Sequence, residues 1–429
     1  MKTDVYVVKC ASYDEAEEKI GELLALMGGM GNFAKAGEKI TLKANLLSAS
    51  SPDKAITTHP AVVAAIGALV KKEGALATIA DSPGTGYRYS EGTLRKLYKA
   101  SGMDEAAKQA GIEVNMDTGH DEVSFPNGKQ LTRMKAIRPV TRADGVINIC
   151  KMKTHMLMHM TGAVKNSFGI IPGISKIGFH AKLLNKGRFA DMLLDLSLYV
   201  SPRLSVMDAV LAMEGDGPGA SGTPRHVGLL LASGNPLAVD VVAGEIMGLP
   251  REHNPVLIAA EKRGLTPNDI KDINVIGEDL RALRIPDYKF TATVENLIQK
   301  TGSSASGTEG GQVSAQASAQ ASGQESSQAS GQEGGHASAQ ASVQASAQAS
   351  GQESGLEGGQ ASAQYPVVLK DKCIGCGICQ NACPQKTITI SAREGNKRAE
   401  IDTKNCILCY CCHEMCPHMA IDITKAAPH

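Results

Sequence analysis

Nine of the eleven cysteines lie near the C-terminus, and eight of them follow one spacing twice. Residues 373–384 and 406–417 both read Cys-x2-Cys-x2-Cys-x3-Cys-Pro. This spacing is typical of [4Fe–4S] binding, because three closely spaced thiolates surround one cluster while the fourth Cys ligates the other cluster. The rule predicts two clusters, with these ligands: Cys373, Cys376, Cys379 and Cys416 for cluster 1, and Cys406, Cys409, Cys412 and Cys383 for cluster 2.

The two motifs belong to matching halves, since positions 373 and 406 and the apolar Ile388 and Ile421 are equally far apart. Each half is expected to form a short strand, a cluster loop, a short helix and a return strand. Two zinc sites are the alternative, but four-thiolate zinc usually takes two well-separated Cys-x2-Cys pairs. Residues 365–429 resemble bacterial-type ferredoxins, which implies a small α+β domain that transfers single electrons. Cys411, beside a ligand, is interpreted as a bystander thiol.

Residues 302–364 have another composition and an internal repeat. Ser, Ala, Gly and Gln dominate, and Gln recurs about every four residues, with His336 and Leu356 at two Gln positions. A four-residue period could place Gln along a helix, but there is no apolar stripe to bury. The composition therefore predicts a disordered linker between a domain at 1–301 and the module at 365–429.

Residues 1–301 alternate short apolar runs with helical patterns. This alternation predicts an α/β domain with a mostly parallel sheet and flanking helices. The expected strands are 5–8, 40–44, 77–81, 146–150, 204–208, 227–232 and 273–276. The expected helices are 13–27, 60–72, 92–100, 103–110, 189–200, 236–247 and 255–262.

Polar residues follow several of these expected strands, where ligands of parallel sheets bind. Lys43 and Asn45 close one strand, and the glycine-containing segments 81–86 and 214–219 follow two others. Neither segment has the glycine spacing of a dinucleotide or P-loop motif. Plain turns are therefore the first interpretation, and a phosphate cradle is the alternative.

The segment 151–166 is the densest in reactive side chains. Lys151, Lys153 and Lys165 suit an anionic substrate, and solvated loop lysines are the alternative interpretation. His155 and His159 have the spacing of a helical metal pair, although no third ligand is evident, and the intervening methionines are expected to pack. In an enzyme, the three lysines would hold the substrate, while His155 or Asp81 would move protons.

These motifs also carry a resemblance. They resemble the domain of unknown function 362 family over roughly residues 4–280, with one departure, Ala44, where Pro is frequent. Members are often fused to a ferredoxin-like module, so the resemblance implies an iron–sulfur redox context and no particular reaction. The matching motifs are Lys43-Ala-Asn-Leu-Leu, Thr57-Thr-His-Pro60, Asp81-Ser-Pro-Gly84, Lys151-Met-Lys-Thr-His155, Gly162-Ala-Val-Lys-Asn166, Phe168-Gly169 and Met213-Glu-Gly-Asp-Gly-Pro218.

The composition limits the classes of binding partner that we expect. The 429 residues carry 44 basic and 44 acidic side chains, and a zero net charge does not favour nucleic acid or an anionic membrane. No apolar run is long enough to cross a bilayer, and the N-terminus has no secretory signal pattern. We therefore expect a cytoplasmic protein whose cysteines are metal ligands or free thiols rather than disulfides.

Two functions follow from these patterns. The first is an iron–sulfur redox protein that transfers electrons through two [4Fe–4S] clusters to or from a site on the α/β domain or a redox partner protein. The second is a non-catalytic adaptor that docks a ferredoxin module on a redox enzyme or a maturation target. The sequence has no decisive fingerprint for a flavin or another cofactor in the α/β domain, which leaves that question open.

Overall fold

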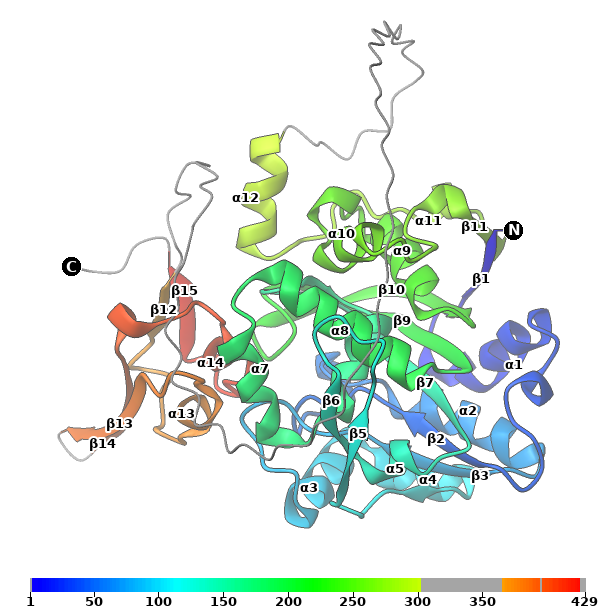
Figure 1. Cartoon of the computed structure of the whole chain (residues 1–429), viewed down its shortest axis with the longest axis horizontal. Helices are drawn as coiled ribbons and strands as arrows, with labels where there is room; N and C mark the ends of the chain where they lie inside the picture. The colour runs from blue at the N-terminus through cyan, green and yellow to red at the C-terminus, as the bar shows by residue number, and fades with distance from the viewer. Residues whose placement is uncertain (1, 302–364, 394–395, 425–429) are drawn as a thin grey trace, which may run out of the picture. The chain divides into compact units, whose positions relative to one another are not determined.

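The computed structural model describes residues 2–301, 365–393 and 396–424 (Figure 1). The expected disordered linker at 302–364, including His336, lies outside the described residues. The described residues of the α/β domain and of the ferredoxin module belong to one compact unit.

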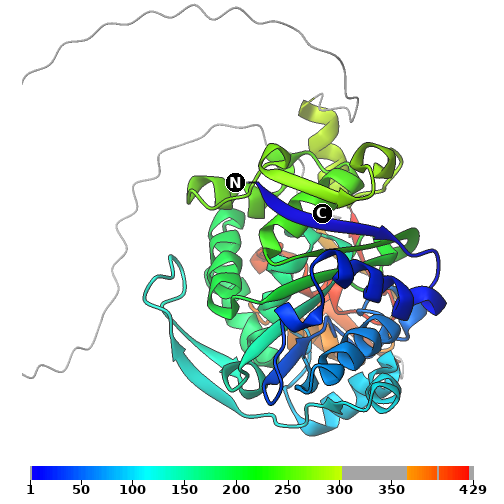
Figure 2. The ribbon, with the colours of Figure 1, turned by 90° about the vertical axis from the view of Figure 1, so that its right-hand side faces the viewer.

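A nine-stranded sheet forms the centre of the α/β domain, in the order β11-β1-β10-β9-β7-β2-β3-β4, with β8 beside β7. Five of its strand pairs are parallel, namely β1 with β11, β2 with β3, β2 with β7, β3 with β4 and β7 with β9. Figure 2 shows β1 and β11, from opposite ends of the domain sequence, side by side. The predicted mostly parallel sheet is thereby confirmed. The strands are β1 Thr3–Lys9, β2 Lys39–Lys43, β3 Leu76–Ala80, β4 Glu113–Val114, β7 Gly145–His155, β8 His159–Thr161, β9 Leu204–Gly215, β10 Gly222–Ser233 and β11 Ile273–Gly277.

Helices cover both faces of this sheet, because its strands are apolar on both sides. In β7, Ile147 and Ile149 pack with the first four helices, while Val146 and Cys150 pack with the later ones. The first face carries α1 Ala16–Leu26, α2 Pro60–Lys72, α3 Glu91–Ser101 and α4 Met103–Ala110. The second carries α6 Ala163–Asn166, α8 Lys186–Val200, α9 Pro236–Met247 and α10 Pro255–Lys262.

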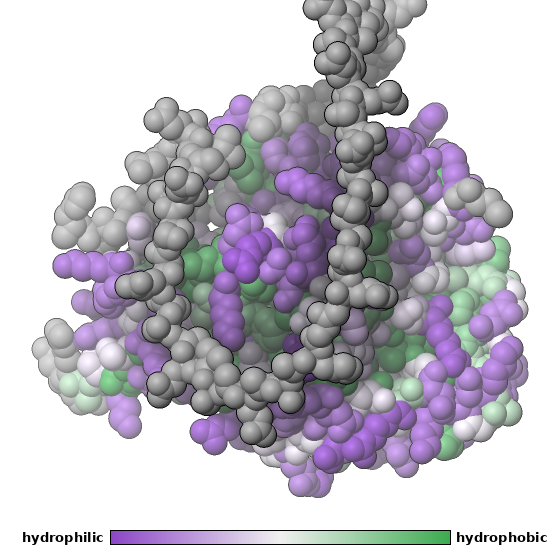
Figure 3. All heavy atoms as spheres, in the orientation of Figure 1, coloured by the Kyte–Doolittle hydropathy of each residue, from purple (hydrophilic) through white to green (hydrophobic). Residues whose placement is uncertain are grey.

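Short elements complete the domain. They are the hairpin of β5 His120–Ser124 and β6 Arg133–Ile137, and the helices α5 Arg138–Thr141, α7 Lys176–Lys182, α11 Leu280–Leu283 and α12 Ala292–Thr301. The face drawn in Figure 3 is mostly hydrophilic, with hydrophobic side chains concentrated in its recessed parts. Among the described residues, no helix has the length and apolarity needed to cross a membrane.

Helix starts follow local capping chemistry. Asn235 and Asn254 each accept hydrogen bonds from the next helix's second and third residues, and a Pro occupies the first helical position. Pro is favoured there because its missing N–H has no partner to lose. The predicted bounds of α9 and α10 therefore agree with the structure at both ends.

Strand β7 differs most from the expectation. It continues to His155, pairing Lys151 with Asp208 of β9 and His155 with His159 of β8. The interpretation of Lys151 and Lys153 as solvated loop lysines is wrong, because both are buried inside the strand. The two histidines face each other across a hairpin and are not one turn apart on a helix. The polar Lys151 and Lys153 stand on either side of the apolar Met152, and this alternation of polar and apolar residues is a strand pattern.

The ferredoxin module repeats one chain path twice, as predicted. Strand β12 (Tyr365–Val368), helix α13 (Ile378–Ala382) and strand β13 (Ile388–Arg393) form the first half. Strand β14 (Asn396–Ile401), helix α14 (Cys411–Glu414) and strand β15 (Ile421–Thr424) form the second half. The pairs β12–β15 and β13–β14 are antiparallel, so the halves are interleaved.

The repeat extends to individual backbone angles. Left-handed conformations occur at Gly375 and Gly377, with φ of 66° and 78°, and again at the equivalent Leu408 and Tyr410, with φ of 53° and 58°. A residue other than Gly is uncommon in this region. Both cluster loops therefore take the same path even where the second half has no glycine to favour it.

Candidate functional site

The predicted cluster ligands line two separate cavities. Cys373, Cys376, Cys379 and Cys416 line one of about 320 Å³, and Cys383, Cys406, Cys409 and Cys412 line another of about 330 Å³. Each cavity therefore combines three cysteines of one motif with the last cysteine of the other. Among the described residues, no three His, Cys, Asp or Glu side chains come close enough to hold a single metal ion. Four thiols around one cavity are the ligand set of a [4Fe–4S] cluster.

Backbone amides point at several of these sulfurs. Thr387 N donates to Cys383 Sγ at 3.4 Å, and the equivalent Ala420 N donates to Cys416 Sγ at 3.2 Å. Ala399 N donates to Cys373 Sγ at 3.3 Å. Hydrogen bonds to ligand sulfurs stabilise negative charge and tune the reduction potential of a bound cluster.

Glycines of the α/β domain lie against helices α13 and α14 of the module. A Cβ at Gly84 would lie 2.7 Å from Met415 Sδ, and one at Gly86 would lie 2.9 Å from Ile378 Cγ2. A Cβ at Gly219 would overlap the Glu414 carbonyl oxygen. The glycine-containing segments 81–86 and 214–219 thus allow close approach of the ferredoxin module. The sequence suggested only turns or phosphate cradles there.

A pocket lies where these two parts meet. It encloses about 530 Å³, part of it open to solvent, and is called the interface pocket below. Its wall includes Asp81, His155 and Lys165 from the α/β domain and Glu414 and Met415 from the module. Three of the five predicted catalytic residues are therefore brought together, at the carboxyl ends of β3 and β7. Glu414 and Met415 stand between Cys412 and Cys416 in the chain.

Asp81 is held rigidly in this wall. Its Oδ1 lies 2.7 Å from Lys43 Nζ, both side chains are buried, and its Oδ2 accepts a hydrogen bond of 2.6 Å from Leu46 N. A Cβ at Gly169 would overlap both partners of the ion pair. Asp81 is thus neutralised and fully engaged, which suits a positioning residue better than a proton carrier.

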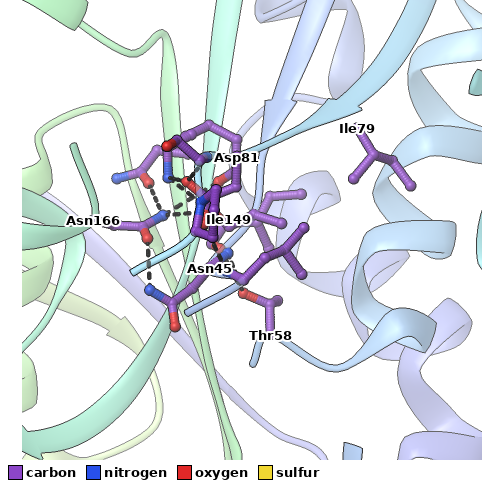
Figure 4. A network of polar contacts seen from close by, with 12 residues as sticks. Asn45, Thr58, Ile79, Asp81, Ile149 and Asn166 are labelled. Atoms are coloured by element: carbon purple, nitrogen blue, oxygen red, sulfur yellow. Dashed lines mark hydrogen bonds and ion pairs between the residues drawn. The ribbon is translucent and has the colours of Figure 1, made fainter. Parts of the chain in front are cut away.

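Amide side chains connect the wall to the buried strand β7 (Figure 4). Asn45 Nδ2 donates to Asn166 Oδ1 at 3.0 Å, and Asn166 Nδ2 donates to Asn148 Oδ1 at 2.7 Å. Lys153 Nζ donates to Asn45 Oδ1 at 2.8 Å and to the Ile56 carbonyl at 2.7 Å. Burial, followed by Lys165 and Lys151, lowers the pKa of Lys153 well below its usual range. Lys153 thus orients Asn45, while its own side chain is outside the pocket wall.

Lys165 projects from helix α6, whose start is fixed by a buried acid. Asp240 Oδ2 accepts from Val164 N at 3.0 Å, and a Cβ at Gly162 would overlap this carboxylate. Burial raises the pKa of Asp240 to about 7. The half-buried Lys165 forms no hydrogen bond or ion pair among the described residues, and burial lowers its pKa, while Glu414 opposes this shift. Its ammonium group is available to a ligand.

Helix α7 supplies two wall residues that the sequence did not indicate. Lys176 Nζ donates to the carbonyl oxygens of Ser82 and Pro83, at 3.1 and 2.7 Å, and to Ser82 Oγ at 2.9 Å. Burial lowers its pKa to about 7. His180 packs its ring against Phe168 and Phe189, and burial lowers its pKa to about 3, so its imidazole is neutral. Residues 171–183 match no motif, and only their three-dimensional position marks them.

His155 has a defined tautomer. Its Nδ1 accepts hydrogen bonds from Leu157 N at 3.1 Å and Met158 N at 3.2 Å, so the proton of the neutral ring is on Nε2. Burial lowers the pKa of His155 well below its usual value. His159, by contrast, contacts His253 and Lys186. The two histidines therefore have different partners and do not act as a metal pair.

Lys151, the fifth predicted catalytic residue, belongs to another network. Its Nζ lies 2.8 Å from Asp208 Oδ2 and 2.9 Å from Tyr13 Oη, and Tyr13 Oη donates to Asp208 Oδ1 at 3.0 Å. The carboxylate also accepts from His59 N at 2.9 Å. This buried cluster joins the segments just before α1 and α2 to β7 and β9, and it does not line the interface pocket. Its geometry is that of a structural ion pair.

A larger groove, of about 1270 Å³, lies at the opposite ends of β2 and β3. It runs along Lys39–Ile40, Leu76–Thr78 and Glu113–Asp117. Its Arg138 and Arg142 form ion pairs with Asp121 at the surface. Ligands of parallel sheets bind at the carboxyl ends of the strands, so the interface pocket is the better candidate.

Comparisons with known proteins agree with this division of the chain. A family model described as "Domain of unknown function (DUF362)" matches residues 40–245, and one described as "4Fe-4S dicluster domain" matches residues 372–420. The Thylakoid-associated protein sll1697 of Synechocystis sp. is 33% identical over 276 residues, which cover 62% of this chain and 81% of that protein.

Among solved structures, the lactate racemase apoprotein from Thermoanaerobacterium thermosaccharolyticum aligns with a TM-score of 0.36 and 12% identity. The alignment covers 58% of this chain and 57% of that chain. A similarity of this size does not bear on function.

The fold and the cysteine cavities define an iron–sulfur protein in which an α/β domain carries a ferredoxin module. The chain belongs to the domain of unknown function 362 family, fused to a 4Fe–4S dicluster domain.

Proposed function

We propose that this protein is a redox protein that transfers electrons between its ferredoxin module and a small molecule bound in the interface pocket. The observation that carries the proposal is the shared wall of this pocket. Glu414 and Met415 line it together with His155 and Lys165, and they stand between Cys412 and Cys416 in the chain. A ligand there would be separated from a cluster-binding cysteine by very few bonds.

We further propose two [4Fe–4S] clusters with crossed ligation, in the two ligand sets given above. Supporting this, each cavity is lined by one complete set, and the two halves of the module have the same backbone path. When bound, such clusters accept and release single electrons.

The polypeptide would supply binding, orientation and exclusion of water. Lys165 would contact the ligand and His155 would present its Nε2 proton. Lys176, bonded to Ser82 and Pro83, and Lys153 with Asn45 would keep the wall in position. Asp81 would hold Lys43 and the loop that begins at Leu46. Lys151 has no contact role in this proposal.

A redox partner protein would exchange electrons at the exposed rim of the first cluster loop. Cys376 is exposed there, and Ile374 keeps 62% of its surface accessible. A non-catalytic adaptor would need only this exposed rim for electron exchange and would not need a ligand pocket. The unpartnered groups of the interface pocket favour an additional ligand site.

Anaerobic purification tests both parts of the proposal. We expect about eight iron and eight sulfide per chain, and a small molecule released on denaturation that mass spectrometry detects. The small molecule should be absent from the Lys165→Met protein and retained by a Lys182→Met control, because Lys182 is exposed on α7. Zinc without sulfide would contradict the clusters. A released molecule unaffected by Lys165→Met would contradict the pocket.

A further inference from the structure

The interface pocket offers more hydrogen-bonding groups than its own residues satisfy. Thr161 Oγ1, His180 Nδ1 and Glu414 Oε1 line it without a hydrogen-bond partner in the described part of the chain. Their residues are only 3%, 6% and 8% exposed. Buried polar atoms are nearly always paired. Three unpaired atoms around one pocket indicate an occupant that bonds to them.

The same wall carries uncompensated positive charge. Lys165 and Lys176 form no ion pair among the described residues, whereas Asp81 is already neutralised by Lys43. Glu414 is the other acid of the wall; its Oε1 lies 3.4 Å from His155 Nε2, and it forms no ion pair with either lysine in the described part of the chain. An anion would restore the balance and would provide an acceptor for the Lys165 ammonium group. The three N–H groups of Lys176 are already bonded to Ser82 and Pro83, so Lys176 would add only its charge.

We propose that the interface pocket binds a small molecule that carries a carboxylate or phosphate group, with its anionic end at Lys165. Further polar atoms of the molecule reach Thr161 and His180. This inference rests on the proposed function, because it names the ligand class of the same pocket. About 60 Å³ of this space admits the centre of a water molecule, which is room for a small anion and not for a large cofactor.

Calorimetric titration of the anaerobic, cluster-loaded full chain tests this ligand class. The probes are oxalate for a carboxylate, inorganic phosphate for a phosphate, and glycerol as a neutral compound, at about pH 6.5, below the pKa of about 7 of Lys176. We expect oxalate or phosphate to bind, and whichever binds more tightly identifies the anionic group. Glycerol should not bind.

Variants locate the binding. Lys165→Met should weaken the anion at least about tenfold, since charge-assisted hydrogen bonds are worth roughly 1.5–3 kcal/mol. Lys165→Arg should restore part of the affinity, Thr161→Val should weaken it several-fold, and the exposed Lys182→Met should leave it unchanged. Iron content and circular dichroism of each variant establish folding.

Three results would overturn the inference: no binding of either anion, equal binding of glycerol, or unchanged affinity in Lys165→Met. The proposed function has a separate readout, because a neutral ligand could still accept electrons in this pocket. Failure of anion binding with intact ligand-dependent electron transfer rejects only the ligand class. Anion binding without electron transfer rejects the proposed function.

Discussion

His155 Nε2, at the end of strand β7, lies 3.4 Å from Glu414 Oε1, at the end of helix α14. Both side chains are buried, with 2% and 8% of their surface exposed, and Glu414 Oε1 has no hydrogen-bond partner among the described residues. The last residue of the central strand of the α/β domain thus faces the last residue of the helix that contains Cys412, a proposed cluster ligand. The first prediction below tests this contact between the α/β domain and the ferredoxin module.

Close approach at Gly219 should be necessary for this arrangement. Gly219→Ala places a methyl group against the Glu414 carbonyl, a backbone atom that cannot move alone, and overpacking costs roughly 1–3 kcal/mol. We expect faster hydrogen–deuterium exchange in residues 82–87 and 411–416, with iron content unchanged. Gly92→Ala is the matched control, since a Cβ there meets nothing within 4 Å. Equal exchange in both variants would contradict the close packing.

The crossed ligand sets predict different losses of iron when Cys383 and Cys411 are replaced. Cys383→Ser should leave about four iron per chain, because it removes a ligand of only one cluster. Cys411→Ser should keep about eight, because Cys411 lines neither cysteine cavity. Iron and sulfide assays, with the electron paramagnetic resonance spectrum of the reduced protein, measure the difference. A full loss of iron in Cys411→Ser would show that the ligand assignment is wrong.

The buried Lys176 should make stability depend on pH. Its pKa is about 7 in the folded protein and 10.5 in an unperturbed lysine, so the unfolded chain holds more protons between these values. The wild type should therefore gain up to about 1.4 kcal/mol per pH unit over this range. Lys176→Met lacks this gain, and its stability relative to the wild type should fall by about 1–3 kcal/mol from pH 7 to pH 9.

Anaerobic denaturant unfolding at several pH values measures this difference. Lys182→Met, from the exposed side of the same helix, should show a constant difference from the wild type. The assignment of a buried, easily deprotonated Lys176 fails if the Lys176→Met difference is equally constant with pH.

Lys151 should act in stability and not in ligand binding. Lys151→Met leaves Asp208 charged and buried without its ammonium partner, and removal of one partner of a buried pair costs roughly 3–5 kcal/mol. The double variant Lys151→Met/Asp208→Asn should recover part of this loss. Affinity for the pocket anion should stay unchanged in whatever folded protein remains. Loss of anion affinity with normal stability would show that Lys151 acts in ligand binding and not in stability.

Local chemistry made part of this structure predictable from the sequence. The cysteine spacing indicated both ligand sets, and each set lines its own cavity. The Asn-Pro pairs before α9 and α10 marked their starts, because capping and proline geometry depend on neighbouring residues.

Other parts depend on contacts between distant segments. Glu414 reaches the interface pocket only because the ferredoxin module packs on the α/β domain, and spacing within either part does not show this. Lys176 and His180 have no motif, and their role comes from the burial of α7. Lys151 and Lys153 looked like loop residues because charged side chains are rarely buried in a strand. Asp208 and Asn45 accept hydrogen bonds from these buried lysines, and both are distant from them in sequence.

Ligand-dependent reoxidation tests the central claim most directly. Protein reduced with dithionite and freed of excess reductant would be mixed, without oxygen, with small-molecule extract fractions, while visible absorption follows the oxidation state. At least one fraction should speed reoxidation of the wild type and of Lys182→Met, and Lys165→Met and Thr161→Val should respond at least tenfold more slowly. Reoxidation of all four proteins at the same rate by every fraction would contradict electron transfer to the interface pocket.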